Sequence, residues 1–227
     1  MEDIKKNYQR IKVEIPNNVS LVVSTKTRTV EEIEEVINAG AEIIGENRVQ
    51  EAALKYKEID DSIDWHLIGH LQSNKVKQAV NIFSMIQSVD SIKLAEKIDK
   101  ECKNIDKKMS VLLEINIASE ESKYGFEPNA EKLSKILKYI KENLTNLEVK
   151  GLMTVEPYFN EPEKSRIYLQ KMNTLYDKIK SNNFPELEIL SMGMTNSYKV
   201  AIEEGANMVR IGTAIFGERN YCKSKIS

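Results

Sequence analysis

The sequence predicts an α/β protein built as a single (β/α)8 barrel of the TIM-barrel type over residues 1–227, with one additional N-terminal helix. Short apolar segments typical of buried strands alternate with segments whose apolar residues recur at helical spacing, and this alternation repeats eight times. Strict alternation implies parallel strands joined by helices, and ~250 residues is the usual size of such a barrel. No Gly-x-Gly-x-x-Gly follows any predicted strand, which disfavours a doubly wound dinucleotide-binding sheet.

Each element is predicted from its own local pattern. An amphipathic helix is expected over residues 3–14, and Thr29 and Glu32 have the spacing of a capping box at the start of a helix that Gly40 should end. Asp90 is expected to cap a later helix. The predicted strands are 19–26, 41–45, 64–69, 83–87, 110–117, 148–154, 187–191 and 208–212. The helices between them are expected near 29–40, 48–57, 73–80, 90–102, 133–140, 168–179 and 197–204.

Composition and charge exclude several classes of function. The chain is 41% hydrophobic and 30% charged, with a net charge of −2, and its basic residues are interspersed with acidic ones, so no basic surface for nucleic acid or an anionic membrane is expected. Cys102 and Cys222 form no Cys-x-x-Cys pair, which is typical of a reducing compartment. The charged N-terminus does not resemble a signal peptide, and no apolar run approaches the ~20 residues of a membrane span. We therefore expect a cytoplasmic protein that binds neither membranes nor nucleic acid.

Lys26 follows the first predicted strand and is the leading candidate for chemistry. Loss of hydration at the exit of a buried strand lowers the pKa of a lysine and favours its neutral, nucleophilic form. Such lysines bond covalently to carbonyl compounds. The alternative is that Lys26 only extends to solvent from the strand end.

Two loops rich in Gly, Ser and Thr follow the last two predicted strands. Barrels often bind phosphate there, beside a helix N-terminus, and a helix is expected to begin near residues 196–197. Ser191, Gly193, Gly212 and Thr213 could supply hydroxyl groups and accessible backbone amides. These glycines could instead serve only tight turns, so both interpretations stay open.

Other polar and aromatic residues give weaker signals. His66 and His70 lie four residues apart on a predicted strand with no third ligand nearby in the sequence, so no metal site is expected. Trp65 is expected in the core or at the rim. The segment 120–123 could be either a solvated loop or a lid.

The strongest motifs together resemble one known family. They are VSTKT (23–27), GEN (45–47), WHLIGHLQ (65–72), ESKYG (121–125), GLMT (151–154), SMGM (191–194) and VRIGTAIFGER (209–219). In this order, and across nearly the whole chain, they resemble the pyridoxal-phosphate homeostasis protein family (the YggS/PROSC type). The resemblance implies a barrel similar to the N-terminal domain of alanine racemase, which binds pyridoxal 5′-phosphate (PLP).

The resemblance also implies roles for particular residues. Lys26 would carry PLP as a covalent aldimine, and Arg210 would face its pyridine nitrogen. The remaining cofactor-binding residues would be Asn47, Ser191, Gly193, Met194, Gly212 and Thr213, the phosphate being held by Ser191, Gly193, Gly212 and Thr213. The sequence departs from the family pattern at Thr29, Arg48 and Thr195–Asn196, which leaves the details of the rim open.

The same residues bear on whether the protein is an enzyme. PLP withdraws electrons most strongly when its pyridine nitrogen is protonated, and Arg210 can only donate hydrogen bonds to that nitrogen. The residues after Arg210 are too few for the further domain that supplies a second acid or base in alanine racemase. We therefore expect a monomeric, non-catalytic carrier or regulator in PLP (vitamin B6) homeostasis, with PLP-dependent apoenzymes as recipients. The alternatives are a small fold-type III racemase or decarboxylase that uses a tyrosine, and a barrel that binds another phosphorylated metabolite without covalent attachment.

Overall fold

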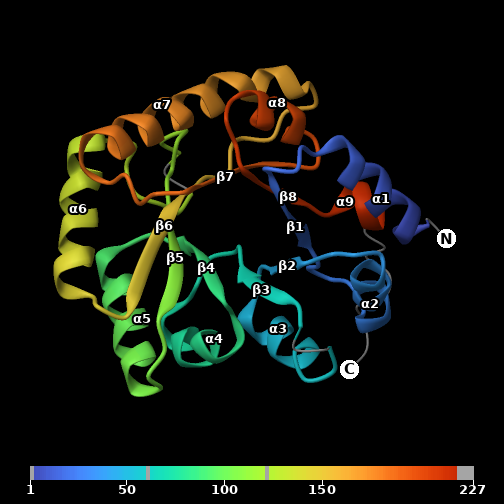
Figure 1. Ribbon diagram of the computed structural model, residues 1–227, viewed down its shortest axis with the longest axis horizontal. Helices are drawn as coiled ribbons and strands as arrows, with labels where there is room; N and C mark the ends of the chain where they lie inside the picture. The colour runs from blue at the N-terminus through green and yellow to red at the C-terminus, as the bar shows by residue number, and fades with distance from the viewer. Residues whose placement is uncertain (1–2, 60–61, 121–122, 219–227) are drawn as a thin grey trace.

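The computed structural model describes residues 3–59, 62–120 and 123–218, and its eight parallel strands close into a barrel in chain order (Figure 1). The predicted (β/α)8 fold is confirmed. The strands are β1 (Ser20–Ser24), β2 (Ile43–Glu46), β3 (Asp64–Leu67), β4 (Met85–Val89), β5 (Met109–Glu114), β6 (Leu147–Met153), β7 (Ile189–Met194) and β8 (Met208–Ile211). Pairing of β8 with β1 closes the barrel and places Arg210 opposite Val22.

Helices surround the strands on the outside of the barrel, and the N-terminal helix α1 packs against α2 and α9 (Figure 1). The helices are α1 (Ile4–Glu14), α2 (Val30–Asn38), α3 (Val49–Lys55), α4 (Val76–Ile82), α5 (Ile92–Asn104), α6 (Ala130–Asn143), α7 (Arg166–Asn183), α8 (Tyr198–Glu203) and α9 (Thr213–Phe216). Two short 3-10 turns, η1 (Ser73–Lys75) and η2 (Pro162–Ser165), precede α4 and α7. Within the described ranges, no helix combines the length and apolar character that crossing a bilayer requires.

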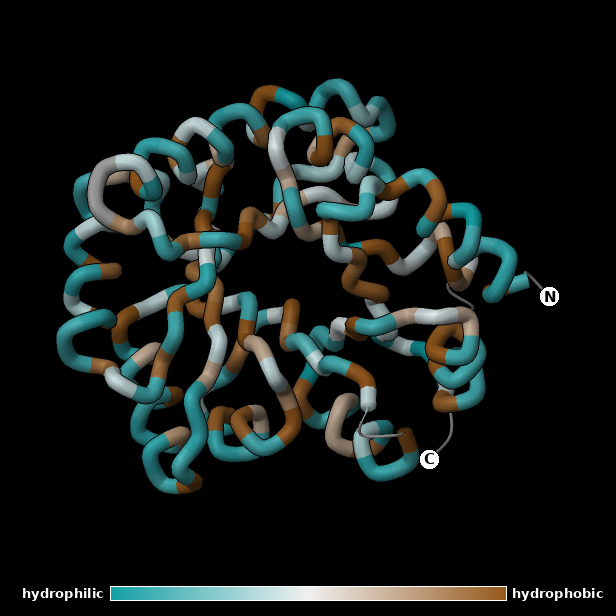
Figure 2. Tube along the Cα trace, viewed as in Figure 1, coloured by the Kyte–Doolittle hydropathy of each residue, from teal (hydrophilic) through white to brown (hydrophobic). Residues whose placement is uncertain are grey.

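The main hydrophobic core lies between the strands and the helices that cover them. The helices contribute buried apolar residues to this core, such as Ile33 and Val36 of α2, which are fully buried. Figure 2 shows hydrophobic and hydrophilic residues interspersed along the helices. A second, smaller cluster contains Met85, Leu112 and Met153, from β4, β5 and β6. Because the core fixes the strands from both sides, the loops at the carboxyl ends of the strands are held on a rigid frame.

The predicted helix starts are confirmed in one case and wrong in another. Thr29 and Glu32 form the expected capping box, with Glu32 N–H donating to Thr29 Oγ1 at 3.3 Å and Thr29 N–H donating to Glu32 Oε2 at 2.9 Å. Asp90 does not cap α5. The cap is Ser91, whose hydroxyl accepts from Leu94 N–H, because the chain turns into the helix one residue later than predicted.

Several strand boundaries also differ from the prediction, and β5, for example, ends at Glu114 rather than at residue 117. Strand β4 begins at Met85 rather than residue 83, because Phe83 still belongs to the end of α4, where its N–H bonds to Ala79 O. Strand β7 begins at Ile189 and continues to Met194, whereas the prediction ended it at Ser191. The longer β7 places Ser191 in the middle of the strand, which matters for the site described next.

Candidate functional site

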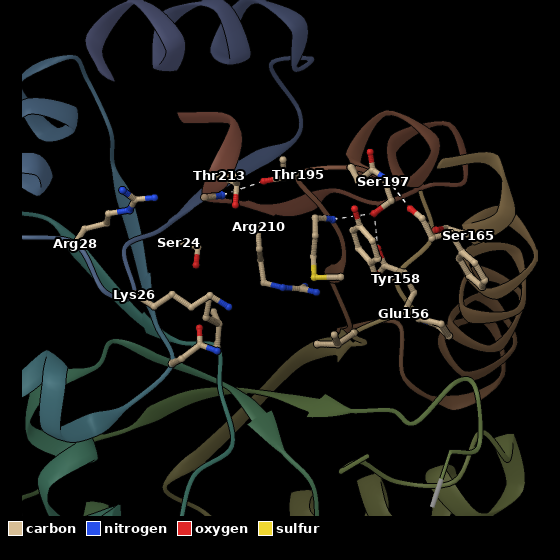
Figure 3. Close-up of a pocket in the computed structure, with 18 residues that line it drawn as sticks. Ser24, Lys26, Arg28, Glu156, Tyr158, Ser165, Thr195, Ser197, Arg210 and Thr213 are labelled. Atoms are coloured by element: carbon tan, nitrogen blue, oxygen red, sulfur yellow. Dashed lines mark hydrogen bonds between the residues drawn. The ribbon is translucent and has the colours of Figure 1, made fainter. Parts of the chain in front are cut away.

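A cavity of about 440 Å3 opens at the carboxyl ends of the strands (Figure 3), within the range typical of small-molecule sites. Six of the residues predicted from sequence line it: Lys26, Asn47, Met194, Arg210, Gly212 and Thr213. These residues come from four separate strand exits, so the barrel brings together side chains that are as far as 187 positions apart in the sequence, Lys26 and Thr213 being the outermost.

Lys26 and Arg210 bring two basic groups into this cavity. Lys26 follows β1, is half-buried, and points into the cavity together with Arg210, as Figure 3 shows. Arg210 lies on β8 and is 5% exposed. Ile68, Val155 and Met194 add apolar wall around these two groups. Arg28 also lines the cavity, which thus combines a primary amine, two guanidinium groups and apolar surface.

Buried hydrogen bonds fix the guanidinium of Arg210. One terminal nitrogen donates to Ser191 Oγ at 2.6 Å, and the other donates to the carbonyl oxygen of Thr154 at 2.7 Å. Burial lowers the pKa of Arg210 below its ordinary value, while the carboxylates of Glu156 and Glu114 raise it. An arginine remains charged under such a shift, so this group offers only hydrogen-bond donors.

The bond to Ser191 continues into a chain of buried side chains across the barrel interior. Ser191 Oγ donates to Gln87 Oε1 at 2.7 Å, and Gln87 Nε2 lies 2.9 Å from His66 Nδ1. Burial lowers the pKa of His66 to about 4, so the ring is neutral at neutral pH and its Nδ1 accepts from Gln87. The chain therefore runs from the charged Arg210 to a neutral histidine and fixes the position of the arginine.

Two of the predicted site residues, Ser191 and Gly193, do not line the cavity. Because β7 extends to Met194, Ser191 lies below the strand exit, and it is fully buried beneath Arg210. Gly193 has a φ of +89°, and a Cβ atom there would lie 2.5 Å from the Cβ of Ala201 on α8. Gly193 thus permits close packing of α8 on β7, and its backbone conformation favours glycine.

Thr195 lies at the true exit of β7, and the sequence prediction did not include it. Its hydroxyl accepts from the backbone N–H of Gly212 at 3.3 Å and from that of Ala214 at 3.5 Å. It therefore joins the exits of β7 and β8, the place where barrels commonly bind phosphate. The signal in the sequence was the threonine that directly follows Gly193 and Met194. Because β7 ends three residues later than predicted, this threonine lies at the strand exit.

A second wall that the sequence did not reveal follows β6. Glu156 is 2% exposed, and one of its carboxylate oxygens accepts from the Ser197 hydroxyl, which in turn accepts from Met194 N–H at 3.0 Å. The other oxygen, Oε2, is buried and has no hydrogen-bond partner in the described part of the chain. Tyr158 stands beside them at the rim and is 74% exposed (Figure 3). No local motif marks this wall, because its residues meet only in the folded barrel.

Glu114 at the end of β5 should make stability depend on pH. Burial raises the pKa of this carboxyl group from 4.5 to about 7, and the Asp90 carboxylate adds to the rise while Arg210 opposes it. The folded state therefore holds this proton more tightly than the unfolded state, so stability falls as pH rises from about 4.5 to 7. We expect Glu114→Gln to be more stable than the wild type at pH 8, by on the order of 1–3 kcal/mol.

Urea unfolding of both proteins at pH 5 and pH 8 checks this expectation. The difference between variant and wild type should be small at pH 5 and largest at pH 8. An equal difference at the two pH values would show that the charge of Glu114 is not its cause.

The remaining candidates from the sequence are distributed over other parts of the barrel. Trp65 is buried and packs edge-on against Tyr56, so it belongs to the core. His66 and His70 do not share a site, because His66 bonds to Gln87 in the interior whereas His70 Nδ1 lies 3.0 Å from Asp90 at the surface. Across the described residues, no three His, Cys, Asp or Glu side chains gather in a way that could hold a metal ion.

The loop after β5 is described only in part. Lys123 and Glu120 form an ion pair of 2.9 Å, and Asn116 Nδ2 donates to the backbone carbonyls of both residues. Tyr124 stacks on His70 with ring centroids 3.6 Å apart. Residues 121–122 of this loop lie outside the described residues, as do Arg219 and Cys222.

Comparison with known proteins places the chain in a family. Residues 1–220 match the family model described as alanine racemase, N-terminal domain. A pyridoxal phosphate homeostasis protein of Aquifex aeolicus is 43% identical over 206 residues, which cover 90% of this chain and 89% of that protein. The chain belongs to the pyridoxal phosphate homeostasis protein family. Its relative of this family in Vibrio alginolyticus is 35% identical, over 97% of this chain and 100% of that protein.

Solved structures agree with the family assignment. PipY of Synechococcus elongatus, determined with PLP bound, is similar with a TM-score of 0.85 and 31% identity, over 94% of this chain and 100% of that chain. Alanine racemase of Clostridium difficile is similar with a TM-score of 0.78 and 18% identity, and 58% of that chain is covered. The second likeness shows the fold alone, and it agrees with the racemase-like barrel that the sequence resemblance implies.

Proposed function

We propose that this chain binds PLP in the cavity at the barrel mouth, attached covalently through Lys26, and serves PLP homeostasis as a carrier without turnover. The observation that carries the proposal is the convergence of the Lys26 amine, the Arg210 guanidinium and the Thr195 contact with two backbone amides on one cavity. Family membership and the PLP-bound PipY structure support the same ligand.

The residues present fit such a ligand. A phosphorylated aromatic aldehyde requires an amine, donors for an anion and apolar wall for its ring, and the cavity has all three. The exit of β8 also leaves room for the anion because residue 212 is a glycine. A Cβ atom there would lie 3.0 Å from Ser24 O and would narrow the end of the cavity between β1 and β8. When bound, PLP supplies a carbonyl group that condenses reversibly with amines.

Each residue then has a proposed role. Lys26 is the attachment point, and Asn47 borders it from the exit of β2. Thr195, Gly212 and Thr213 hold the phosphate through hydroxyl and amide donors. Arg210 faces the pyridine nitrogen, and Met194 forms part of the wall. Ser191 acts beneath the cavity by holding Arg210, and Gly193 acts through the packing of α8.

The arginine favours a carrier over an enzyme. A racemase or decarboxylase would gain from a protonated pyridine nitrogen, and the donor-only guanidinium of Arg210 keeps a proton away from that position. The tyrosine that lines the described cavity, Tyr158, is largely exposed at the rim, where water competes for its hydroxyl. We infer that PLP-dependent apoenzymes receive the ligand, and that residues 1–227 act in the cytoplasm as one monomeric domain.

Hydrogen exchange at Cα of free amino acids tests carrier against enzyme. We expect the PLP-loaded protein in heavy water to incorporate deuterium no faster than free PLP at the same concentration. The Lys26→Ala variant with added PLP provides the background. Exchange or decarboxylation at about 1 per second or faster, lost in that variant, would identify an enzyme instead.

A further inference from the structure

A buried ionic cluster lies directly behind Lys26, outside the cavity. Lys55 at the end of α3 is almost buried, and its Nζ atom lies 2.7 Å from Glu46 Oε1 and 2.6 Å from Glu51 Oε1. The same Nζ donates to the carbonyl oxygen of Thr25 at 2.9 Å. A lysine ammonium has three N–H donors, so these three bonds use all of them.

The cluster holds the chain on both sides of Lys26. On one side, the Thr25 hydroxyl donates to Glu46 Oε1 at 2.7 Å. On the other, Thr27 N–H donates to Glu51 Oε1 at 2.5 Å. Thr27 has a φ of +67°, in the left-handed region that β-branched residues rarely adopt. Bonds from the cluster thus fix a strained turn, and Lys26 is the residue between its two fixed ends.

Stability alone gives little reason for this arrangement. Burial raises the pKa of Glu46 although Lys55 opposes the rise, so taking the carboxylate out of water outweighs the attraction of the lysine. A buried ion pair is often no more stabilising than apolar residues of the same volume. The cluster buries groups that are costly to bury, and it bonds to the residues on both sides of the attachment lysine. These bonds indicate that its role is to fix the position of Lys26.

We propose that Lys55, with Glu46 and Glu51, is a positioning group that holds the Lys26 turn so that the amine meets the carbonyl carbon of the ligand. The inference rests on the proposed function and assigns a role to residues that do not line the cavity. In the attachment, the Lys26 nitrogen and the carbonyl carbon form a C=N bond, and the carbonyl oxygen leaves as water. Positioning should change the rate of this step without changing how the cavity holds the rest of the ligand.

The test separates attachment from binding. The rate of attachment is followed by the visible absorbance that appears on mixing protein with PLP. Binding is followed with pyridoxine 5′-phosphate, which has an alcohol in place of the aldehyde and cannot attach. We expect Lys55→Met and Glu51→Ala to slow attachment by about 10–100-fold while the Kd for pyridoxine 5′-phosphate stays unchanged.

Lys107→Met is the matched control. Its Nζ donates to the carbonyl oxygens of Val80 and Phe83 at 2.8 and 2.9 Å. Phe83 lies just before β4 and Lys107 just before β5, so these bonds lie at the amino ends of the strands, opposite the cavity. The control also removes a partly buried lysine ammonium that donates to backbone carbonyls, but far from the attachment lysine, and should attach PLP at the wild-type rate. If Lys55→Met does not fold, Glu51→Ala carries the test, because the Glu51 side chain is 26% exposed and its loss leaves less charge buried.

Three results would overturn the inference. Attachment at the wild-type rate in Glu51→Ala and Lys55→Met would show that the cluster does not position the amine. A parallel loss of pyridoxine 5′-phosphate binding would show that it supports the cavity as a whole. If the wild type itself did not attach PLP, the proposed function would fail first, and the inference with it, so the two failures are distinguishable.

Discussion

Replacing Lys26 by alanine is expected to remove all covalently attached PLP from the protein. Among the residues that line the described cavity, Lys26 carries the one primary amine. The other two basic residues, Arg28 and Arg210, have guanidinium groups, which do not form an imine with the aldehyde of PLP at neutral pH. The Lys26 side chain is half-buried and extends into the cavity, so its truncation should leave the core intact. Borohydride reduction followed by peptide mass spectrometry measures the attachment, which should be complete in the wild type and absent in the variant.

A matched variant separates the amine from its charge. Lys26→Arg keeps a positive group in the cavity but offers no primary amine, so it should also fail to attach PLP while binding pyridoxine 5′-phosphate. Urea unfolding should give both variants a stability close to that of the wild type. Recovery of the reduced adduct on another lysine would overturn the assignment of Lys26.

The fold could be predicted because its signals are local. Helical periodicity identified the amphipathic helices, and the capping pair Thr29 and Glu32 fixed the start of α2. The boundaries of β4 and β7 were less predictable for a physical reason. Strands of a parallel barrel are covered on both faces, so they show continuous apolar runs without the alternation that would mark their ends. All five residues of β4 are buried, and nothing in that run shows where the strand begins.

The site was predictable mainly where a residue lies at or just after the carboxyl end of a strand. Lys26, Asn47 and Arg210 were found in this way, and all three line the cavity. The same reasoning put Ser191 at the exit of β7, but the strand continues for three more residues, so Ser191 is buried and does not line the cavity. That error also concealed Thr195. Contacts between distant segments, such as Glu156 with Ser197, leave no pattern in a single sequence.

The partners of Arg210 show what the fold adds to the sequence. Its hydrogen bonds lead through Ser191 and Gln87 to His66, on four different strands of the barrel. Each of these polar groups would be costly to bury alone, and each finds a partner in the next. Ser191, which the motif suggested as a phosphate contact, bonds here to the arginine and to Gln87. We therefore expect the hydroxyl groups at the strand exits to matter more for binding.

Removing the hydroxyls at the exits of β7 and β8 should strongly weaken the retention of PLP. Thr195→Val with Thr213→Val preserves side-chain shape and removes two donors from the proposed phosphate end. A hydrogen bond to a charged group contributes about 1.5–3 kcal/mol. The double variant should therefore lose on the order of 10²–10⁴ in affinity, since each 1.4 kcal/mol corresponds to a factor of ten. Equilibrium dialysis with pyridoxine 5′-phosphate measures this loss without covalent attachment.

Ser191→Ala provides the contrast that locates the phosphate. Its hydroxyl is fully buried and bonds to Arg210 and Gln87, so its loss should affect the cavity only through the position of the arginine. We expect a smaller loss of affinity than in the double variant. If Ser191→Ala weakened binding as much as Thr195→Val with Thr213→Val, the anion would contact the middle of β7. The proposed phosphate position at the strand exits would then be wrong. Ser191 is fully buried beneath Arg210, so its hydroxyl could contact an anion only if the anion were bound deeper in the barrel than we propose.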